Sequence, residues 1–252
     1  MGKITGVIIA LNAEETIERA IDSLFFCDEI IVIDGGSTDK TLEIVRKKKA
    51  IVFERKFDNF KNQREFALSK VKTDWVIFLD SDEQVEKTLA EEILKEIKKN
   101  TEDGFYLMRA SYFLGKLIRF GGWYPDYSLR VFRKEKARIS ESIVHEKILV
   151  EGKVKKIKRG KIIHYTDPDL FHYINKLNLY TELSARELFS KGKRASILDL
   201  IFRPLYFFLR MYIIRLGFLD GFHGFILAIC SSFHTFIKYA KLWNLSHKLK
   251  HN

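Results

Sequence analysis

The sequence predicts an α/β fold in which a mostly parallel β-sheet is flanked by helices and followed by a C-terminal helical extension. Short apolar, β-branched runs alternate with helical patterns over the first part of the chain. The composition, 46% hydrophobic and 31% charged, is that of a chain that can bury a sizeable core. Beyond residue 166 the chain becomes both apolar and basic. We therefore expect an α/β domain over residues 1–165 and an extension over residues 166–252.

The expected elements follow from hydrophobic periodicity. The expected strands cover residues 4–11, 29–34, 51–53 and 74–79, and the expected helices follow Asn12, begin near Thr41, and cover residues 62–71 and 87–99. Strands that alternate with helices of this length form parallel sheets, whose ligands bind beyond the carboxyl ends of the strands. Asn12, Asp34 and Asp80 each lie at or just after the end of a strand. We expect these three residues to converge on that edge.

The triplet Asp80-Ser81-Asp82 follows the expected strand 74–79. Two carboxylates spaced i and i+2 in a turning segment can approach one cation or its bound water. Mg²⁺ or Mn²⁺ suits such oxygen ligands and bridges a diphosphate well. The alternative is a solvated turn after a strand, but the apolar run 76–79 before the triplet favours the metal site.

The segment Asp34-Gly35-Gly36-Ser37-Thr38-Asp39 ends the second expected strand. Its glycines let the backbone turn sharply and approach a ligand closely. For Thr38 and Asp39 we favour the ordinary role of capping the next helix. Asp34 ends a buried strand on the same edge as Asp80, so we expect its carboxylate to accept hydrogen bonds from a base or ribose.

Together these segments resemble family 2 glycosyltransferases with the GT-A (Rossmann-like) fold. The likeness is strongest to the lipopolysaccharide-core glucosyltransferase-like subgroup. It covers nearly the whole chain and rests on Ala10-Leu11-Asn12, Asp34 to Asp39, Asn62-Gln63-Arg64, Leu79-Asp80-Ser81-Asp82-Glu83, Trp123-Tyr124-Pro125-Asp126, Leu129-Arg130-Val131-Phe132-Arg133, Val144-His145-Glu146 and Gly217-Phe218-Leu219-Asp220-Gly221.

The resemblance implies inverting transfer of a sugar from a nucleotide-sugar donor without a covalent intermediate. It implies that Asp34 contacts the nucleoside, that Asp80 lies near the ribose and the metal, and that Asp82 is the direct metal ligand. Arg64, on the helix before the metal strand, is expected to meet a phosphate or to order Asp80. With Asn12, these residues form the expected donor site.

The catalytic base is expected to be a carboxylate, but family members usually carry it in a Glu-Asp pair that is missing here. By order along the chain, Glu146 is the first candidate. Asp126 is the second, because its aromatic neighbours Trp123, Tyr124 and Tyr127 would raise the pKa of a carboxyl by desolvation. A surface strand and a turn after Pro125 are the structural alternatives for the two positions.

Four further side chains have two interpretations each. Arg130 and Arg133 alternate with apolar residues, so they either bind phosphate or line a solvated strand face. His164, like His145, could help to hold the metal or the diphosphate, although a lone histidine is more often structural.

The net charge of +11 indicates a negatively charged partner. Residues 216–236 are long enough to span a bilayer, but Asp220 and His223 interrupt them. The spacing of Arg203, Arg210 and Arg215 favours amphipathic helices lying at a membrane interface over a spanning helix. The alternative for the extension is packing against the sheet or against a second subunit in a homodimer.

The location predicted from the sequence is cytoplasmic, peripheral on the inner face of the cytoplasmic membrane. The start of the chain runs straight into a strand, so we expect no secretory signal. Cys27 and Cys230 are far apart and fit no metal spacing, as in a reduced protein. The expected acceptor is a saccharide or a lipid-linked saccharide.

Two other functions fit the sequence less well. A sugar-nucleotide pyrophosphorylase needs a glycine-rich, basic loop after the first strand, where this chain has the acidic segment Asn12-Ala13-Glu14-Glu15. A non-catalytic protein that binds nucleic acid or membranes fits the charge and the aromatic content. However, it leaves three aspartates on one sheet edge unexplained, so we expect no nucleic-acid partner.

Overall fold

The computed structural model describes residues 2–140, 147–167 and 169–248. The chain divides into two compact units. Unit 1 comprises Met1–Ala110 and Asp126–His164, and unit 2 comprises Ser111–Pro125 and Tyr165–Asn252. The division after His164 lies beside the boundary expected at residue 165. The segment 111–125, which the sequence placed inside the α/β domain, belongs to unit 2 instead.

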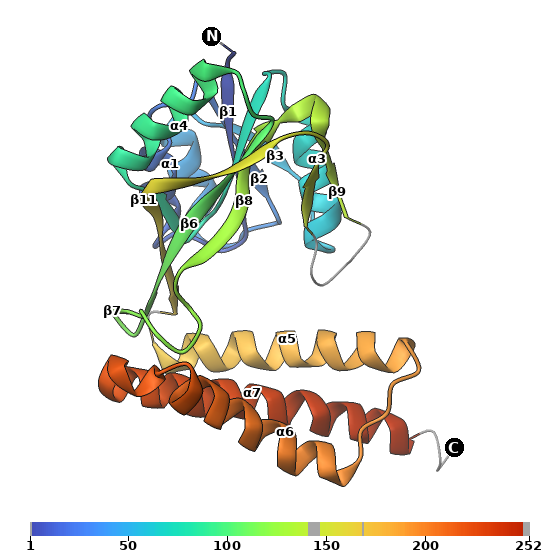
Figure 1. Ribbon diagram of the computed structural model, residues 1–252. Coiled ribbons are helices and arrows are strands. Elements are labelled where there is room, and N and C mark those ends of the chain that lie inside the picture. Colours follow the sequence, from blue (N-terminus) through green and yellow to red (C-terminus); the bar gives the residue numbers. More distant parts are fainter. Residues whose placement is uncertain (1, 141–146, 168, 249–252) are drawn as a thin grey trace. The chain divides into compact units, whose positions relative to one another are not determined.

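Within the described ranges, nine strands form one mixed sheet in the order β3-β2-β1-β4-β8-β6-β11-β5, with β7 beside β6 (Figure 1). A separate antiparallel pair joins β9 and β10. The strands are β1 (Ile4–Ala10), β2 (Glu29–Asp34), β3 (Ile51–Glu54), β4 (Trp75–Asp80), β5 (Glu83–Val85), β6 (Gly104–Phe113), β7 (Lys116–Leu117), β8 (Asp126–Arg133), β9 (Ala137–Ile139), β10 (Ile148–Val150) and β11 (Val154–Asp167).

The helices of unit 1 lie between these strands along the chain, and the described helices of unit 2 follow the last strand. They are α1 (Ile17–Ser23), α2 (Thr41–Lys47), α3 (Phe60–Lys70), α4 (Lys87–Lys99), η1 (Lys134–Lys136), α5 (Leu170–Ser190), α6 (Ile197–Leu209), η2 (Arg210–Ile214), η3 (Gly217–Asp220) and α7 (Gly221–Lys248).

The predicted α/β class and the parallel strands are confirmed. β3, β2, β1 and β4 are parallel neighbours, as the alternation of strand and helix requires. The parallel part ends at β4, because β8 pairs with it in the antiparallel direction and β6 continues that pattern. β6 and β11, of 10 and 14 residues, are the longest strands that the structure describes.

The sheet of unit 1 separates two apolar layers. Ile8, Ile77 and Leu79 point to the layer that contains α1 and α4. Their neighbours in sequence, including Val7 and Phe78, point to the layer that contains α3. This alternation is the period-two pattern of a strand covered on both faces, and Figure 1 shows the helices on opposite sides of the sheet.

The helix expected directly after Asn12 begins later, at Ile17. Asn12 has a left-handed backbone with φ of 50°, a conformation that asparagine tolerates better than most residues. It therefore does not cap α1. The chain makes a turn over residues 13–16, in which Thr16 and Ile17 donate backbone hydrogen bonds to Ala13.

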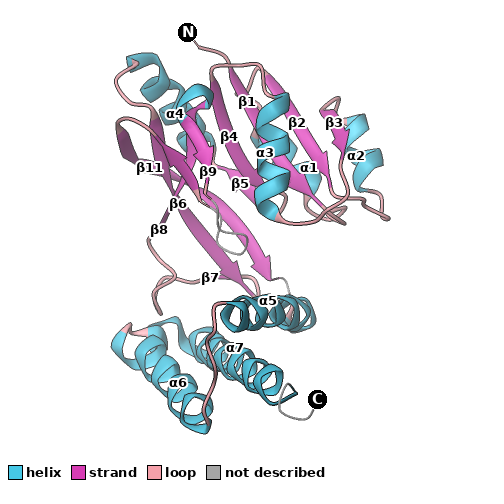
Figure 2. Cartoon of the chain, turned by 90° about the vertical axis from the view of Figure 1, so that its right-hand side faces the viewer, coloured by secondary structure: helices cyan, strands magenta, loops and turns pink. Residues whose placement is uncertain are grey.

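Unit 2 is built from α5, α6 and α7 with the segment 111–125. α7 lies between α5 and α6 (Figures 1 and 2). A core of Phe113, Ile118, Met211 and Leu227 joins the segment to the helices. The Asp220 carboxylate is buried and accepts hydrogen bonds from the backbone N–H groups of Arg119 and Phe120. The Gly217 to Gly221 motif therefore holds this segment in place.

Among the described helices, no single one has the length and apolar composition needed to cross a membrane. The segment Ile197–Ile214 and the segment Gly217–His247 meet the length and composition criteria together, but as a pair bent by 70°.

Candidate active site

The register of the parallel strands places Asp34 and Asp80 at the same edge of the sheet. Asp34 is aligned with Ala10 of β1, and Asp80 is aligned with Ile9 on the other side of that strand. Neighbouring strands are about 4.8 Å apart, so the two aspartates lie about 10 Å from each other across β1. The convergence predicted from the sequence is thus present in the backbone.

Asp34 is 1% exposed, and its carboxylate folds back on its own turn. Its Oδ2 accepts hydrogen bonds from the backbone N–H groups of Gly36 and Ser37, each at 2.9 Å, and its Oδ1 accepts from the Ser37 hydroxyl. Gly36 has φ of 101°, a backbone conformation that glycine adopts without steric strain, which explains why a glycine occupies this position. Asp34 therefore shapes the loop after β2, and the same loop presents its backbone at the sheet edge.

Asn12 joins the loop after β1 to the loop after β2. Its side-chain Oδ1 accepts a hydrogen bond from the backbone N–H of Thr38 at 2.8 Å, and its own N–H donates to the Ser37 hydroxyl at 2.9 Å. Asp39 Oδ1 accepts a hydrogen bond from the backbone N–H of Thr41, the first residue of α2, although the N-cap of this helix is Lys40. The two loops form one hydrogen-bonded platform at the carboxyl ends of β1 and β2.

Asp80 and Glu83 share one guanidinium. Arg130 Nη2 donates to Asp80 Oδ2 at 2.9 Å and to Glu83 Oε1 at 2.7 Å. Burial on its own would raise the pKa of Asp80, but Arg130, with smaller contributions from Arg64 and His164, lowers that pKa below its ordinary value. Burial raises the pKa of Glu83, and this is opposed by Arg130. Arg130 is buried and paired with carboxylates, so it does not line a solvated strand face.

A second arginine extends this row of charges to the base candidate Asp126. Arg109 Nη1 lies 3.6 Å from Glu83 Oε1, and its Nη2 and Nε bind Asp126 Oδ2 at 2.6 and 2.9 Å. Asp80, Arg130, Glu83, Arg109 and Asp126 thus alternate in sign along one chain of contacts. We call these five residues the charge chain; it fixes Asp126 on β8 relative to the aspartate that ends β4.

Asp82 faces a histidine. Its Oδ2 lies 3.2 Å from His164 Nε2 on β11, and about a quarter of its side chain is exposed. No group of three His, Cys, Asp or Glu side chains placed to hold a metal occurs among the residues that the structure describes. The carboxylate–imidazole pair therefore offers two ligands, and a cation there would take its other ligands from substrate and water.

Arg64 lies beside the same aspartates. Its Nη2 is 3.9 Å from Asp80 Oδ1, and its guanidinium stands over the ring of Phe78 at 5.7 Å. α3 supplies this side chain from the layer opposite α1 and α4. Arg64 is therefore within ion-pair distance of Asp80.

Glu146 and His145 lie outside the described residues, so the first base candidate has no structural description. Of the two candidates, Asp126 alone can be placed. It is the first residue of β8, and its side chain is 37% exposed.

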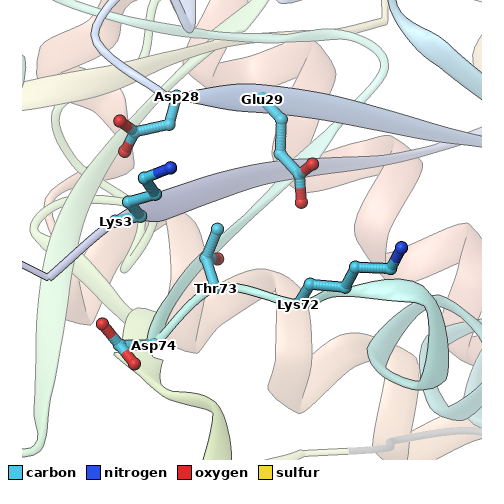
Figure 3. A pocket seen from close by; sticks show the side chains of 6 residues that line it. All are labelled: Lys3, Asp28, Glu29, Lys72, Thr73 and Asp74. Carbon is cyan, nitrogen blue, oxygen red and sulfur yellow. The ribbon is translucent and has the colours of Figure 1, made fainter.

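A pocket at the opposite edge of the sheet is a different feature (Figure 3). Its lining comes from the amino ends of β1, β2 and β4 and consists of Lys3, Asp28, Glu29, Lys72, Thr73 and Asp74. Glu29 accepts a hydrogen bond from Thr5, and Asp28 accepts one from the N–H of Ile4. These side chains fasten the strand ends, and parallel sheets bind ligands at the other edge.

Residues 5–150 match the sequence profile of glycosyl transferase family 2, which is more than half of the chain. The chain belongs to this family. It is 31% identical over 260 residues to the lipopolysaccharide core biosynthesis glycosyltransferase LpsC of Rhizobium meliloti, covering 98% of this chain and 94% of that protein. It is also 31% identical to an uncharacterized glycosyltransferase of Rickettsia typhi, covering 98% of this chain and 89% of the relative.

A solved structure supports the GT-A fold of this glycosyltransferase. The crystal structure of S. aureus TarS 1-349 in complex with UDP aligns with a TM-score of 0.51 and 15% identity, covering 98% of this chain and 91% of that one. The predicted family and fold are thus confirmed. The chain is an enzyme, so membership decides against both the pyrophosphorylase and the non-catalytic binding protein.

Sequence reasoning missed two members of the charge chain of this glycosyltransferase. Glu83 follows the triplet Asp80-Ser81-Asp82 directly and is 0% exposed, yet the only sign of its role in the sequence was its place in a family motif. Arg109 lies in β6, where an arginine in a strand normally indicates a solvated face. Its partner Asp126 is distant in sequence, and the antiparallel register of β6 and β8 sets the two residues opposite each other.

Proposed function

We propose that this family 2 enzyme is an inverting glycosyltransferase that moves a sugar from a nucleotide-diphosphate sugar to a saccharide or lipid-linked acceptor. The product would belong to cell-envelope polysaccharide or lipopolysaccharide, as the name of the relative from Rhizobium meliloti indicates for that protein. The observation that carries this proposal is the set of polar side chains at the carboxyl edge of β1, β2 and β4. Carboxylates at such an edge suit a diphosphate held through a cation.

The reaction is a single displacement. An acceptor hydroxyl attacks the anomeric carbon, the bond from that carbon to the diphosphate oxygen breaks, and the nucleoside diphosphate leaves with the electron pair. The hydroxyl proton passes to a carboxylate of the enzyme. Attack from the face opposite the leaving group inverts the anomeric configuration.

For the metal we propose Mg²⁺ or Mn²⁺ at Asp82. The residues fit such an ion, because the partly exposed Asp82 carboxylate stands beside His164, whereas Asp80 is already bound by Arg130. Small divalent cations are commonly held by one or two protein ligands together with substrate phosphates. When bound, the ion neutralises charge on the departing diphosphate. Asp80, two residues before Asp82, would add its negative charge to this site while its carboxylate stays bound to Arg130.

For the donor we propose a site made of the Asn12 platform, Arg64 and Asp80. The nucleoside would lie against the backbone of the loop that Asp34 shapes, since the Asp34 carboxylate is buried in its own turn. Arg64 stands close enough to Asp80 to meet a phosphate and to order that carboxylate.

For the base we keep two candidates, Asp126 and Glu146. Arg109 orients the Asp126 carboxylate, which is what a positioned base requires. We expect the true base, once changed to its amide, to lower the rate of transfer by about a hundredfold to ten-thousandfold while leaving donor binding intact. Transfer rates of Asp126→Asn and Glu146→Gln that both match the wild type would remove both candidates.

For the location we propose the cytoplasm, peripheral on the inner face of the cytoplasmic membrane. The net charge is +11, and the helices of unit 2 expose many large apolar side chains. Attachment to the membrane would bring the enzyme to a lipid-linked acceptor. A homodimer is the other arrangement that could cover these helices.

Donor screening by mass spectrometry tests the proposed reaction. We expect one UDP-, GDP- or ADP-sugar to be hydrolysed slowly in the presence of Mn²⁺ and faster when an acceptor is supplied. Asp82→Ala should lose this turnover, and Asp22→Ala, an exposed aspartate of α1, should keep it. No turnover of any common nucleotide sugar with acceptors present would refute the assignment.

A further inference from the structure

The helix α6 exposes a row of large apolar side chains in unit 2. Six of its residues are from 45% to 69% exposed, namely Ile197, Leu198, Ile201, Phe202, Leu205 and Leu209. Successive residues of an α-helix are rotated by about 100°, so these six fall within an arc of about 140°. The buried Pro204 lies outside that arc. This helix therefore has an apolar face that nothing in the described structure covers.

Basic side chains border this face along one edge. Arg203 and Arg210 follow the apolar arc around the helix, with the exposed Tyr206 between the arc and the two arginines. Arg203 Nε binds Asp199 Oδ1 at 2.6 Å, one turn earlier on the same edge. Arg215 is exposed at the end of η2. An apolar face edged by guanidinium groups is the pattern of a helix that lies in a membrane interface.

The helix α7 extends the same surface with a second apolar row, whose residues recur at intervals of three or four: Phe222, Phe225, Ile229, Phe233 and Phe236. The ring of Phe225 packs against Phe208 at 6.3 Å and against Tyr212 at 5.6 Å. These contacts place the row beside α6 and η2. We call the two rows together with Arg203, Arg210 and Arg215 the docking face.

The charges of the docking face favour a lipid surface over a second copy of the chain. From residue 197 to the end of the chain, the acids are Asp199, which is paired with Arg203, and Asp220, which is buried. In a twofold contact between two such faces, Arg210 and Arg215 of each copy would meet a face whose acids are already paired or buried. Anionic phospholipid headgroups would pair with these arginines, and acyl chains would cover the apolar rows.

We infer that the docking face binds an anionic phospholipid surface, with α6 and α7 lying in the plane of the interface and their apolar rows turned toward the acyl chains. This inference rests on the proposed peripheral location and names the surface that provides it. An exposed apolar area of this kind is unusual in a protein without a partner, because monomers rarely expose large contiguous apolar patches.

Co-sedimentation of the full chain with vesicles tests the inference. The probes are phosphatidylcholine vesicles with and without phosphatidylglycerol. We expect strong binding to the mixed vesicles and weak binding to the neutral ones. Phe202→Glu, at a position 60% exposed, should weaken binding about tenfold or more, because it removes one buried aromatic side chain from the lipid phase. Phe25→Glu, in unit 1 and 62% exposed, should bind like the wild type.

A second variant tests the charges. The double change Arg210→Gln and Arg215→Gln should weaken binding to mixed vesicles by about 30-fold, the equivalent of about 2 kcal/mol. The pair Lys47→Gln and Lys98→Gln removes the same charge from exposed positions of unit 1 and should have a much smaller effect. Equal losses from both pairs would show that net charge alone drives binding and would overturn the assignment of the face.

Three other results would overturn the inference. The wild type could stay in the supernatant with mixed vesicles, or Phe25→Glu could lose binding as Phe202→Glu does. A stable dimer that Phe202→Glu dissociates, without vesicle binding by the wild type, would assign the face to a second copy. The vesicle assay needs no sugar donor, so it tests membrane binding alone. Stabilisation by UDP with Mn²⁺, measured without lipid, tests the donor site separately, so a failure of the proposed reaction can be told apart from a failure of this inference.

Discussion

At the scale of residues, the charge chain is the main addition to what the sequence indicates. The sequence singled out Asp80 as a ligand and Asp126 as a base but gave no reason to connect them. The structure connects them through Arg130, Glu83 and Arg109. Buried charges are stable when each has an opposite partner, so every internal member of the chain depends on its neighbours.

The most sensitive member should be Glu83, because it is fully buried between two arginines. We expect Glu83→Gln to lower the free energy of unfolding by about 2 kcal/mol, since Arg130 keeps one carboxylate partner, Asp80. Urea unfolding measures this change. Glu86→Gln, three residues along and half-buried, serves as the control. Equal losses of stability in the two variants would mean that the charge chain contributes no more to the free energy of unfolding than the Glu86 carboxylate does.

Sequence reasoning could not find these contacts because they depend on register. Arg130 and Arg109 lie on two antiparallel strands, and a shift of one residue would turn either side chain to the other face. For Asp34 the sequence indicated the correct edge but not the buried turn that occupies its carboxylate. The local hydrogen bonds of an aspartate before two glycines compete with ligand binding.

At the scale of elements, the parallel strands were predictable and the antiparallel ones were less so. β1, β2 and β4 are buried on both faces, so they appear in the sequence as continuous apolar runs. β6 and β11 carry charged residues between apolar ones and extend over 10 and 14 residues, which obscures their ends. α1 begins at Ile17 because Asn12 is engaged with the neighbouring loop.

The helix α4 is fastened to β11 by a charge pair that should respond to pH. Glu96 accepts from Lys99 and lies 2.9 Å from Lys155 Nζ on β11. The hydrogen bond from Lys99 lowers the pKa of Glu96; burial opposes this, and Lys155 adds to the lowering. A carboxyl with a lowered folded pKa stabilises the protein above its unfolded pKa, and that stabilisation is lost as pH falls through the folded pKa.

We therefore expect Glu96→Gln to lower the free energy of unfolding by about 1 kcal/mol near pH 7. The difference from the wild type should shrink as pH falls below about 4.3, the ordinary value for glutamate. Urea unfolding at several pH values measures it. Glu91→Gln, an exposed position on the same helix, is the control, and a difference that persists at low pH would contradict the assignment to charge.

At the scale of the whole molecule, the sequence indicated an α/β domain with an apolar and basic extension, and the structure describes two compact units. The unexpected part is the segment 111–125, which packs with the helices of unit 2 through Phe113 and Ile118. Its aromatic residues resembled those of the surrounding strands, so composition could not assign it. The Asp220 carboxylate binds this segment, but the backbone N–H groups that donate to it lie more than 90 residues earlier in the chain. The motif around Asp220 therefore did not reveal its partner from the sequence.

The measurement that tests the central claim most directly is thermal unfolding with UDP and Mn²⁺. We expect UDP with Mn²⁺ to stabilise the wild type, by about 2.7 kcal/mol when the UDP concentration is one hundred times its dissociation constant. Asp82→Ala should lose this stabilisation, and Asp74→Ala, at the opposite edge of the sheet, should keep it. Full stabilisation of Asp82→Ala, or equal stabilisation of the wild type by DNA without metal, would contradict a nucleotide-sugar site at Asp82.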